Sequence, residues 1–317
     1  MEYRQLGRTA LTISRIGFGC AAIGGYDYGK VCDKDSIAAV HRALEVGVNF
    51  FDTADVYGFG HSEEVLGQAL SGRSKDVVVA TKVGVAWDDL GRRRRDLSPT
   101  YIRKAIDNSL RRLQIECIPL YQIHWPDPLT PLGETVDALT ECQRAGKIQV
   151  IGCCNFSLKT VEEAQTMCRI ESIQLPFSLI DRRYEREIQQ CWQQHNMAIL
   201  CYNVLAHGLL TGKYNQSSRF DNTDLRQRSS FFDVEQMASN MRLLKQLRRV
   251  GTRHARSPAQ TAVRWALSHA AVTCAITGAK HAKQIDENAG SVGWCFSGED
   301  AAVLHGRNVS EPIQRRV

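Results

Sequence analysis

The chain has 317 residues, of which 43% are hydrophobic and 23% are charged, and its net charge is +6 at pH 7. This balance is typical of a soluble globular protein and excludes a disordered, low-complexity chain. No apolar run reaches the roughly 20 residues that cross a bilayer, and no motif combines basic with aromatic residues for nucleic-acid binding. We therefore expect neither a membrane nor a nucleic acid as a partner.

Short apolar runs alternate with amphipathic stretches along the whole chain. The predicted strands are residues 13–19, 48–51, 77–81, 118–124, 148–153, 172–175, 198–202 and 273–277. The stretches with helical periodicity are residues 34–46, 63–70, 100–113, 132–145, 158–167, 185–195, 235–267 and 282–289. We expect the stretch 235–267 to break near Gly251 and Pro258 into two helices.

Strands that are apolar along their whole length, with helices between them, indicate a parallel sheet covered by helices. Eight strands are the number that closes a (β/α)8 TIM barrel. An open doubly wound sheet is the alternative, but the glycines after the first strand lack the GxGxxG spacing. We predict a single α/β barrel domain over residues 1–317, with an N-terminal β-hairpin that turns at Gly7–Arg8 and caps the bottom of the barrel.

The N-terminal segment and the cysteines indicate a cytoplasmic protein. Residues 1–9 are polar and lack an apolar signal core. The eleven cysteines are odd in number and form no CxxC pair or His/Cys cluster, so we expect reduced core thiols and no metal site. Four arginines at 92–95 are most simply a solvated loop, with contact to an anionic substrate as the alternative. The oligomeric state is open, and a homo-oligomer is one option.

Four polar residues stand at or just beyond the ends of three successive predicted strands: Asp52, Tyr57, Lys82 and His124. The carboxyl ends of barrel strands share one rim, where active sites lie, so we expect these side chains to meet. Together they form a proton donor for a carbonyl oxygen. The ammonium lowers the pKa of the phenol, the carboxylate holds the ammonium, and the imidazole orients the carbonyl.

Six motifs in order along the chain resemble those of the aldo-keto reductases. They are FFDTADVYG (50–58), VVVATK (77–82), LYQIHWP (120–126), GCCNF (152–156), YNVLAHGLLTGKY (202–214) and ITGAKHAKQIDEN (276–288). The long segment after YNVLAHG resembles the branch with potassium-channel β-subunits and bacterial aldehyde and sugar-ketone reductases. The resemblance covers nearly the whole chain. It implies an NADPH-dependent oxidoreductase that reduces a small aldehyde or ketone, with Tyr57 as the general acid.

The resemblance also implies the residues that hold NADPH. Gln174 would bind the nicotinamide carboxamide, Tyr202 would stack on the nicotinamide ring, and Lys280 would hold the 2′-phosphate that distinguishes NADPH from NADH. The remaining members are Cys154, Asn155, Asn203, Leu205, Lys213, Gly278, Gln284, Glu287 and Asn288. Cys154 stands where the family usually has serine, and it is either a tolerated exchange or an oxidation-sensitive thiol.

A function from another class is an NADPH-binding regulatory subunit with little or no turnover, similar to the channel β-subunits. His124 favours catalysis, because the channel-type members have asparagine at this position. The sequence does not identify the substrate. We expect its pocket to be formed by residues 84–96, 127–130 and 207–232, and the candidate aromatic walls are Tyr26, Tyr28, Trp87 and Trp125.

Overall fold

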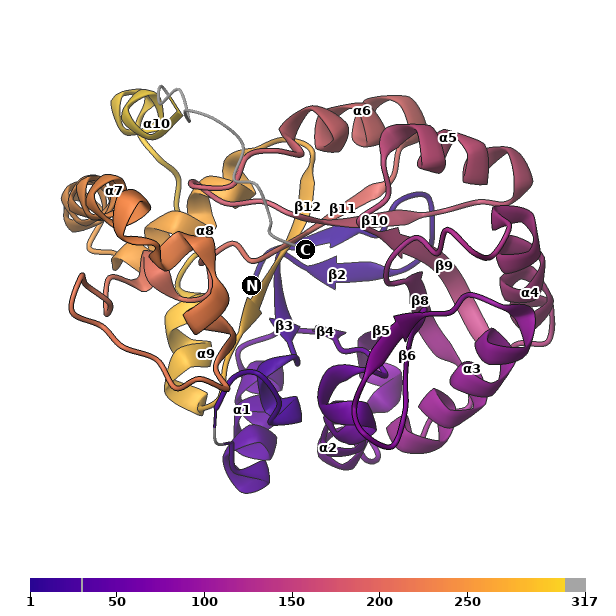
Figure 1. Ribbon diagram of the computed structural model, residues 1–317. Coiled ribbons are helices and arrows are strands. Elements are labelled where there is room, and N and C mark those ends of the chain that lie inside the picture. The colour runs from indigo at the N-terminus through magenta and orange to yellow at the C-terminus, as the bar shows by residue number, and fades with distance from the viewer. Residues whose placement is uncertain (30, 306–317) are drawn as a thin grey trace.

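The computed structural model describes residues 1–29 and 31–305. Eight parallel strands close into a barrel, and helices surround it (Figure 1). In the order in which they neighbour one another, the strands are β3 (Ile16–Gly19), β4 (Phe50–Asp52), β5 (Val78–Val83), β8 (Ile118–Ile123), β9 (Ile148–Cys154), β10 (Ser172–Pro176), β11 (Ala198–Tyr202) and β12 (Val272–Gly278). The predicted (β/α)8 barrel is confirmed.

The helices follow the predicted alternation with the strands. They are α1 (Asp33–Glu45), α2 (His61–Ala69), α3 (Pro99–Leu113), α4 (Leu132–Arg144), α5 (Leu158–Met167), α6 (Glu185–His195), α7 (Val234–Arg253), α8 (Pro258–Ser268), α9 (Ala282–Ala289) and α10 (Gly298–His305). The predicted break separates α7 from α8. It is fixed by a capping box in which the Ser257 hydroxyl accepts the Gln260 N–H and the Gln260 side chain accepts the Ser257 N–H.

The predicted strand 13–19 is two strands in the structure. β2 (Thr12–Ser14) pairs antiparallel with β1 (Tyr3–Gln5), and β3 begins only at Ile16. Arg15 lies between them. Its N–H donates to the Glu2 carbonyl at 2.9 Å, whereas its carbonyl accepts the Ala275 N–H of β12 at 2.9 Å. The chain therefore passes from the hairpin to the barrel at this residue.

The β1–β2 hairpin closes the bottom of the barrel, as predicted (Figure 1). Leu6 and Ile13 are fully buried and pack against the side chains that fill the barrel interior. The turn places Gly7 at φ +57°, and a Cβ there would lie 2.4 Å from the Glu171 carbonyl oxygen. Glycine at this turn therefore allows the hairpin to approach the barrel closely.

A second hairpin, β6 (Val85–Trp87) with β7 (Arg93–Arg95), stands where the sequence predicted a loop. Asp88 supports its turn, since the carboxylate oxygen Oδ1 accepts the N–H groups of Leu90 and Arg92, each at 3.0 Å. β7 consists of exposed arginines. A strand without apolar alternation gives no periodic signal, which is why the prediction missed it.

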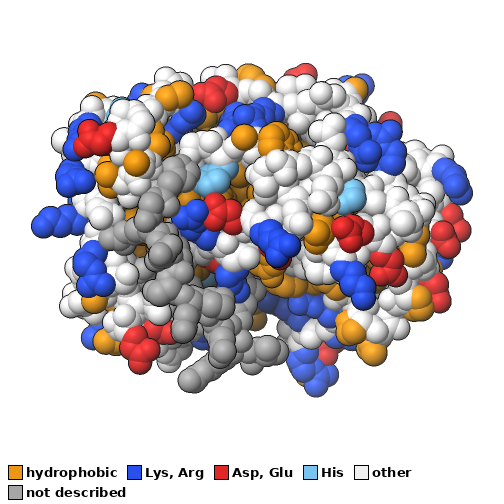
Figure 2. Space-filling model, turned by 90° about the horizontal axis from the view of Figure 1, so that it is seen from above, with side chains coloured by type: hydrophobic (Ala, Val, Ile, Leu, Met, Phe, Trp, Pro, Cys, Tyr) orange, Lys and Arg blue, Asp and Glu red, His pale blue; other side chains and the backbone are white. Residues whose placement is uncertain are grey.

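The surface carries charges of both signs, which are interspersed on the face shown in Figure 2. Within the described residues, no helix combines the length and the apolarity needed to span a membrane. All eleven cysteines are free, but Cys32 and Cys295 are exposed. The prediction of core thiols is therefore wrong for these two.

Candidate active site

Alternation of side chains along the strands brings Asp52, Lys82 and Gln122 into the barrel interior. Each stands two positions beyond an apolar residue of the buried interior layer, namely Phe50, Ala80 and Leu120. The register pairs Lys82 with Gln122 on neighbouring strands, and all three polar side chains are buried. Gln122 was not predicted as a site residue, although a polar residue within an apolar strand is a recognisable signal.

The ammonium group of Lys82 is held by three oxygen atoms. Its Nζ donates to Asp52 Oδ1 at 2.8 Å, to the Thr53 carbonyl at 2.7 Å and to Tyr57 Oη at 3.3 Å. The second carboxylate oxygen of Asp52 accepts the Gln174 amide N–H at 2.7 Å. Because Lys82 is 0% exposed and all three of its hydrogens are used, its charge is fixed beside the phenol.

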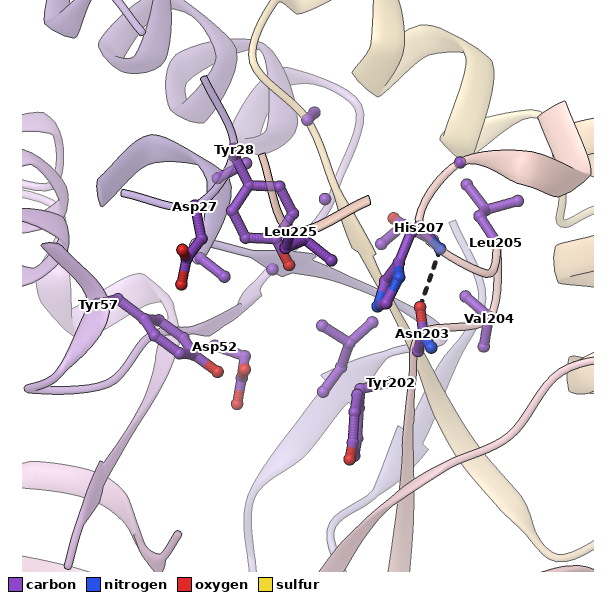
Figure 3. A pocket seen from close by; sticks show the side chains of 18 of the residues that line it. Asp27, Tyr28, Asp52, Tyr57, Tyr202, Asn203, Val204, Leu205, His207 and Leu225 are labelled. Carbon is purple, nitrogen blue, oxygen red and sulfur yellow. Dashed lines mark hydrogen bonds between the residues drawn. The ribbon is translucent and has the colours of Figure 1, made fainter. Parts of the chain in front are cut away.

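Tyr57 and His124 complete the predicted group of four. Tyr57 follows β4, and its ring packs edge-on against the His124 ring with centroids 5.7 Å apart. Both residues line one cavity. Figure 3 shows Tyr57 and Asp52 on one side of this cavity and Tyr202 and Asn203 on the other. His124 Nδ1 is buried and has no hydrogen-bond partner within the described part of the chain.

Burial and charge set the protonation states of these groups. Burial raises the pKa of Tyr57, and this exceeds the opposing effect of Lys82. Lys82 does act to lower this pKa, as expected, but the net shift is upward because burial outweighs the ammonium and Asp52 also raises the pKa. Burial tends to lower the pKa of Lys82, but Asp52 and Tyr57 raise it by more, so the pKa is raised overall. Burial, with Lys82, lowers the pKa of His124. At neutral pH the phenol and imidazole are uncharged and the ammonium is charged.

The cavity has a volume of about 1120 Å³ and runs from these residues to the start of α9. This is larger than the 300–1000 Å³ typical of small-ligand pockets, so the cavity has room for more than one small ligand. Predicted cofactor residues line it along its length: Asn155, Gln174, Tyr202, Asn203, Leu205, Lys213, Gly278, Lys280, Gln284, Glu287 and Asn288. Lys82 and Cys154 do not reach the lining. Among the described residues, no group of three or more His, Cys, Asp or Glu side chains is arranged to hold a metal ion.

Cys154 is buried below the cavity, and burial raises the pKa of its thiol. A protonated, inaccessible thiol is a poor nucleophile, so the structure favours the tolerated exchange over an oxidation-sensitive site.

The next residue, Asn155, connects two parts of the rim. Its amide donates to the His124 carbonyl at 3.0 Å and accepts the Tyr202 hydroxyl at 2.9 Å.

The far end of the cavity is basic. Lys280 Nζ donates to the Tyr28 carbonyl, and the Lys280 N–H donates to the Gln284 side chain at 2.7 Å. Arg226 and Lys213 also line this cavity, and both are close enough to Lys280 to lower its pKa, after the larger effect of burial. Arg226 was not predicted, because its place in the long segment after β11 depends on tertiary contacts.

The predicted substrate walls are partly correct. Tyr26, Tyr28 and Trp125 line the cavity, whereas Trp87 is not part of the lining and packs against Phe59 with ring centroids 5.9 Å apart. Residues 127–130 also contribute nothing to the lining. The side chain of Asp127 instead accepts the Leu97 N–H at 3.0 Å and the Thr130 hydroxyl at 2.7 Å, which holds that loop against the segment that precedes α3.

The arginines of β7 are not a merely solvated loop. Arg93, Arg94 and Arg95 line the cavity. The Arg93 guanidinium lies 4.7 Å from the centroid of the Tyr26 ring, and that of Arg95 lies 4.7 Å from the Trp125 ring. These cation–π contacts place positive charge at the mouth of the cavity.

Gly58 holds the Tyr57 turn against the segment after β3. It has φ +62°, and a Cβ there would lie 2.1 Å from the Gly24 carbonyl oxygen. We expect Gly58→Ala to lower the free energy of unfolding by about 3 kcal/mol, from backbone strain and this clash together. Gly72→Ala is the matched control, because Gly72 has φ +74° but open space around it, and should cost about 1 kcal/mol. Urea unfolding measures both, and equal losses would contradict the role of the Gly24 contact.

Comparisons with known proteins agree with this geometry. The model of the aldo/keto reductase family matches residues 15–305. "Aldo-keto reductase yakc", named for NADP(+), from Schizosaccharomyces pombe is 33% identical over 287 residues, which cover 89% of this chain and 84% of that protein. "NADH-specific methylglyoxal reductase" from Escherichia coli is 32% identical over 333 residues, covering 99% and 100%. The solved structure of the glycerol dehydrogenase AKR11B4 from Gluconobacter oxydans has a TM-score of 0.90 at 34% identity, covering 99% and 98%.

Proposed function

Because the chain belongs to the aldo/keto reductase family, we propose that it reduces an aldehyde or ketone with NADPH, using Tyr57 as the general acid. The observation that carries this proposal is the position of the Lys82 ammonium, 2.8 Å from the Asp52 carboxylate and 3.3 Å from the Tyr57 hydroxyl. His124 faces the same cavity, and the basic end of that cavity suits a nucleotide phosphate.

Each of the four residues has a separate task in the proposed reaction. NADPH, when bound, supplies the hydride for the carbonyl carbon. Tyr57 gives its proton to the carbonyl oxygen, and Lys82 stabilises the phenolate that is left. Asp52 holds Lys82 in place, and neutral His124 donates a hydrogen bond that orients the carbonyl oxygen. The phenolate then regains a proton from solvent.

The preference for NADPH over NADH rests on the basic end of the cavity. Lys280, Arg226 and Lys213 are cations that line it, and a 2′-phosphate is best recognised by such groups. The two relatives are named for different cofactors, so family membership leaves the preference open. Removing the charge of Lys280 therefore tests whether the protein prefers NADPH to NADH.

We expect Lys280→Gln to raise the KM for NADPH by about tenfold to a hundredfold, because it removes a charge-assisted hydrogen bond to the 2′-phosphate. The KM for NADH should stay within about twofold of wild type, since NADH has no phosphate at that position. Steady-state kinetics with both cofactors measure the two constants.

Lys283→Gln is the matched control, because Lys283 lies three residues further along, in the first turn of α9, but is exposed and does not line the cavity. Its KM for NADPH should equal that of wild type. A Lys280→Gln protein whose KM rises equally for NADPH and NADH would show that the lysine does not read the 2′-phosphate.

The reductase itself is tested by turnover of a panel of simple aldehydes, sugars, polycyclic ketones and pyridoxal, with NADPH and NADH in parallel. Binding of each cofactor is measured beside it by fluorescence quenching. Turnover of at least one carbonyl supports the reductase. Tight NADPH binding without turnover of any of them would instead support a regulatory subunit that holds the cofactor.

A further inference from the structure

A second cavity, of about 710 Å³, lies at the bottom of the barrel beside the β1–β2 hairpin, at the opposite end from the first cavity. We call it the lower cavity. β1, α8 and the segment leading into α10 form its walls. The lining residues are Glu2, Tyr3, Arg4, Arg15, Arg264, Leu267, Ser268, Cys295, Phe296 and Ala301.

Three guanidinium groups meet at this cavity, and two of them are almost completely buried. Arg15 is 3% exposed and Arg264 is 9% exposed. Arg15 donates to the Val272 carbonyl at 2.6 Å, and Arg4 donates to the same oxygen at 3.0 Å. These bonds fix two of the arginines side by side at the start of β12. Such crowding of like charge is unfavourable unless an anion offsets it.

Several of the buried N–H groups have no hydrogen-bond partner among the described residues. They are Nε of Arg15 and both Nε and Nη1 of Arg264. An unpaired donor on a buried charged group destabilises a protein considerably more than an exposed one. Native structures normally supply such groups with a partner.

The protein supplies only one carboxylate to the described lining, that of Glu2. Its Oε1 is 3.5 Å from Arg264 Nη1, too far for a good hydrogen bond, and it accepts the Gly293 N–H at 2.8 Å. Three positive charges therefore face one negative charge. Burial, followed by repulsion from Arg4, lowers the pKa of Arg15 to about 10, which leaves it charged at neutral pH.

We propose that the lower cavity binds a small oxyanion, a carboxylate or phosphate group held by Arg4, Arg15 and Arg264. A planar guanidinium offers two parallel N–H groups, which match the paired oxygens of these anions. Such an anion would offset the excess charge and would accept hydrogen bonds from the Arg264 N–H groups that Glu2 leaves without a partner. Leu267 and Phe296 provide apolar walls for the body of an organic anion. The site is separate from the proposed reductase site and does not depend on it.

The reactivity of the Cys295 thiol can be used to detect an anion bound at this site. Cys295 is exposed, lines the lower cavity, and its Sγ lies 3.3 Å from Arg264 Nη2. Cys32, the other exposed cysteine, lines neither cavity and serves as the internal control. The experiment measures alkylation of both thiols by iodoacetamide, with mass spectrometry of the two peptides. Inorganic phosphate or benzoate replaces chloride at constant ionic strength, and saturating NADP(H) fills the basic end of the upper cavity.

We expect phosphate, benzoate or both to slow the alkylation of Cys295 in a saturable way and to leave Cys32 unchanged. The anion that protects Cys295 more strongly shows whether the site prefers a phosphate or a carboxylate. Protection of neither thiol by either anion would overturn the proposal, and so would equal protection of Cys295 and Cys32. Neither result would bear on reductase activity, which is measured in the same samples.

Two variants are expected to change the affinity for the anion in opposite directions. A folding defect would not strengthen binding, so the pair distinguishes loss of the site from misfolding. Arg264→Gln should raise the apparent dissociation constant of the protecting anion at least about tenfold. Glu2→Gln should lower it about fivefold, because it removes the competing carboxylate. Arg111→Gln, an exposed arginine on α3 outside the lower cavity, should leave it unchanged. An unchanged constant in both Arg264→Gln and Glu2→Gln would contradict the site.

Discussion

Tyr57→Phe is expected to lower kcat for carbonyl reduction by about 10³-fold, within the range that loss of a general acid produces. The phenol is the uncharged proton donor that contacts the Lys82 ammonium directly, since Lys82 Nζ lies 3.3 Å from its oxygen. The dissociation constant of NADPH should stay within about twofold of wild type, because the ring and its packing on His124 remain. Single-turnover kinetics and fluorescence quenching measure the two quantities.

Tyr121→Phe is the matched control. Tyr121 lies on β8, is fully buried, and its hydroxyl has no hydrogen-bond partner within the described residues, so removing the hydroxyl should leave kcat unchanged. In wild type, the raised pKa of Tyr57 and the lowered pKa of His124 keep both groups uncharged. We therefore expect kcat to be flat between about pH 6 and pH 9. A Tyr57→Phe protein with wild-type kcat would refute the proposed acid.

The arrangement of the barrel and of the four residues could be predicted because both depend on local pattern. The alternation of strands and helices predicts a parallel barrel, in which all strands end at the same rim. Asp52 and Lys82 lie at the ends of two of these strands. Their contacts needed no further information, since neighbouring strands in a barrel bring such positions together. A side-chain period of two also fixes which residues point inward.

Other features depend on tertiary contacts that no local pattern encodes. The sign of the pKa shift of Tyr57 follows from the balance of burial against the Asp52–Lys82 pair, which the sequence does not contain. The β6–β7 hairpin forms through backbone pairing under a run of arginines. Arg226 and the crowding of Arg15 with Arg264 result from segments far apart in the chain. At these positions tertiary contacts bring like charges together, although the local sequence does not favour it. Such conflicts are often found at functional sites.

Lys82→Met should have a double effect, on stability and on turnover. It leaves the Asp52 carboxylate buried without the ammonium that lies 2.8 Å away, so the free energy of unfolding should fall by about 3–5 kcal/mol. The stabilisation in wild type should not vary between about pH 6 and pH 9. A raised folded-state pKa of a lysine contributes stability that is complete below the unfolded pKa near 10.4 and is lost only at higher pH. Urea unfolding across this range measures it.

The double variant Asp52→Asn/Lys82→Met separates the two effects of Lys82. It removes both buried charges, and replacing a buried ion pair by uncharged residues is often neutral, so most of the lost stability should return. Turnover should not return, because the phenolate of Tyr57 would still lack a cation at 3.3 Å. We expect kcat to stay at least about 10²-fold below wild type. If turnover recovered together with stability, Lys82 would be a structural partner of Asp52 and Tyr57 would need no cation to act as the acid.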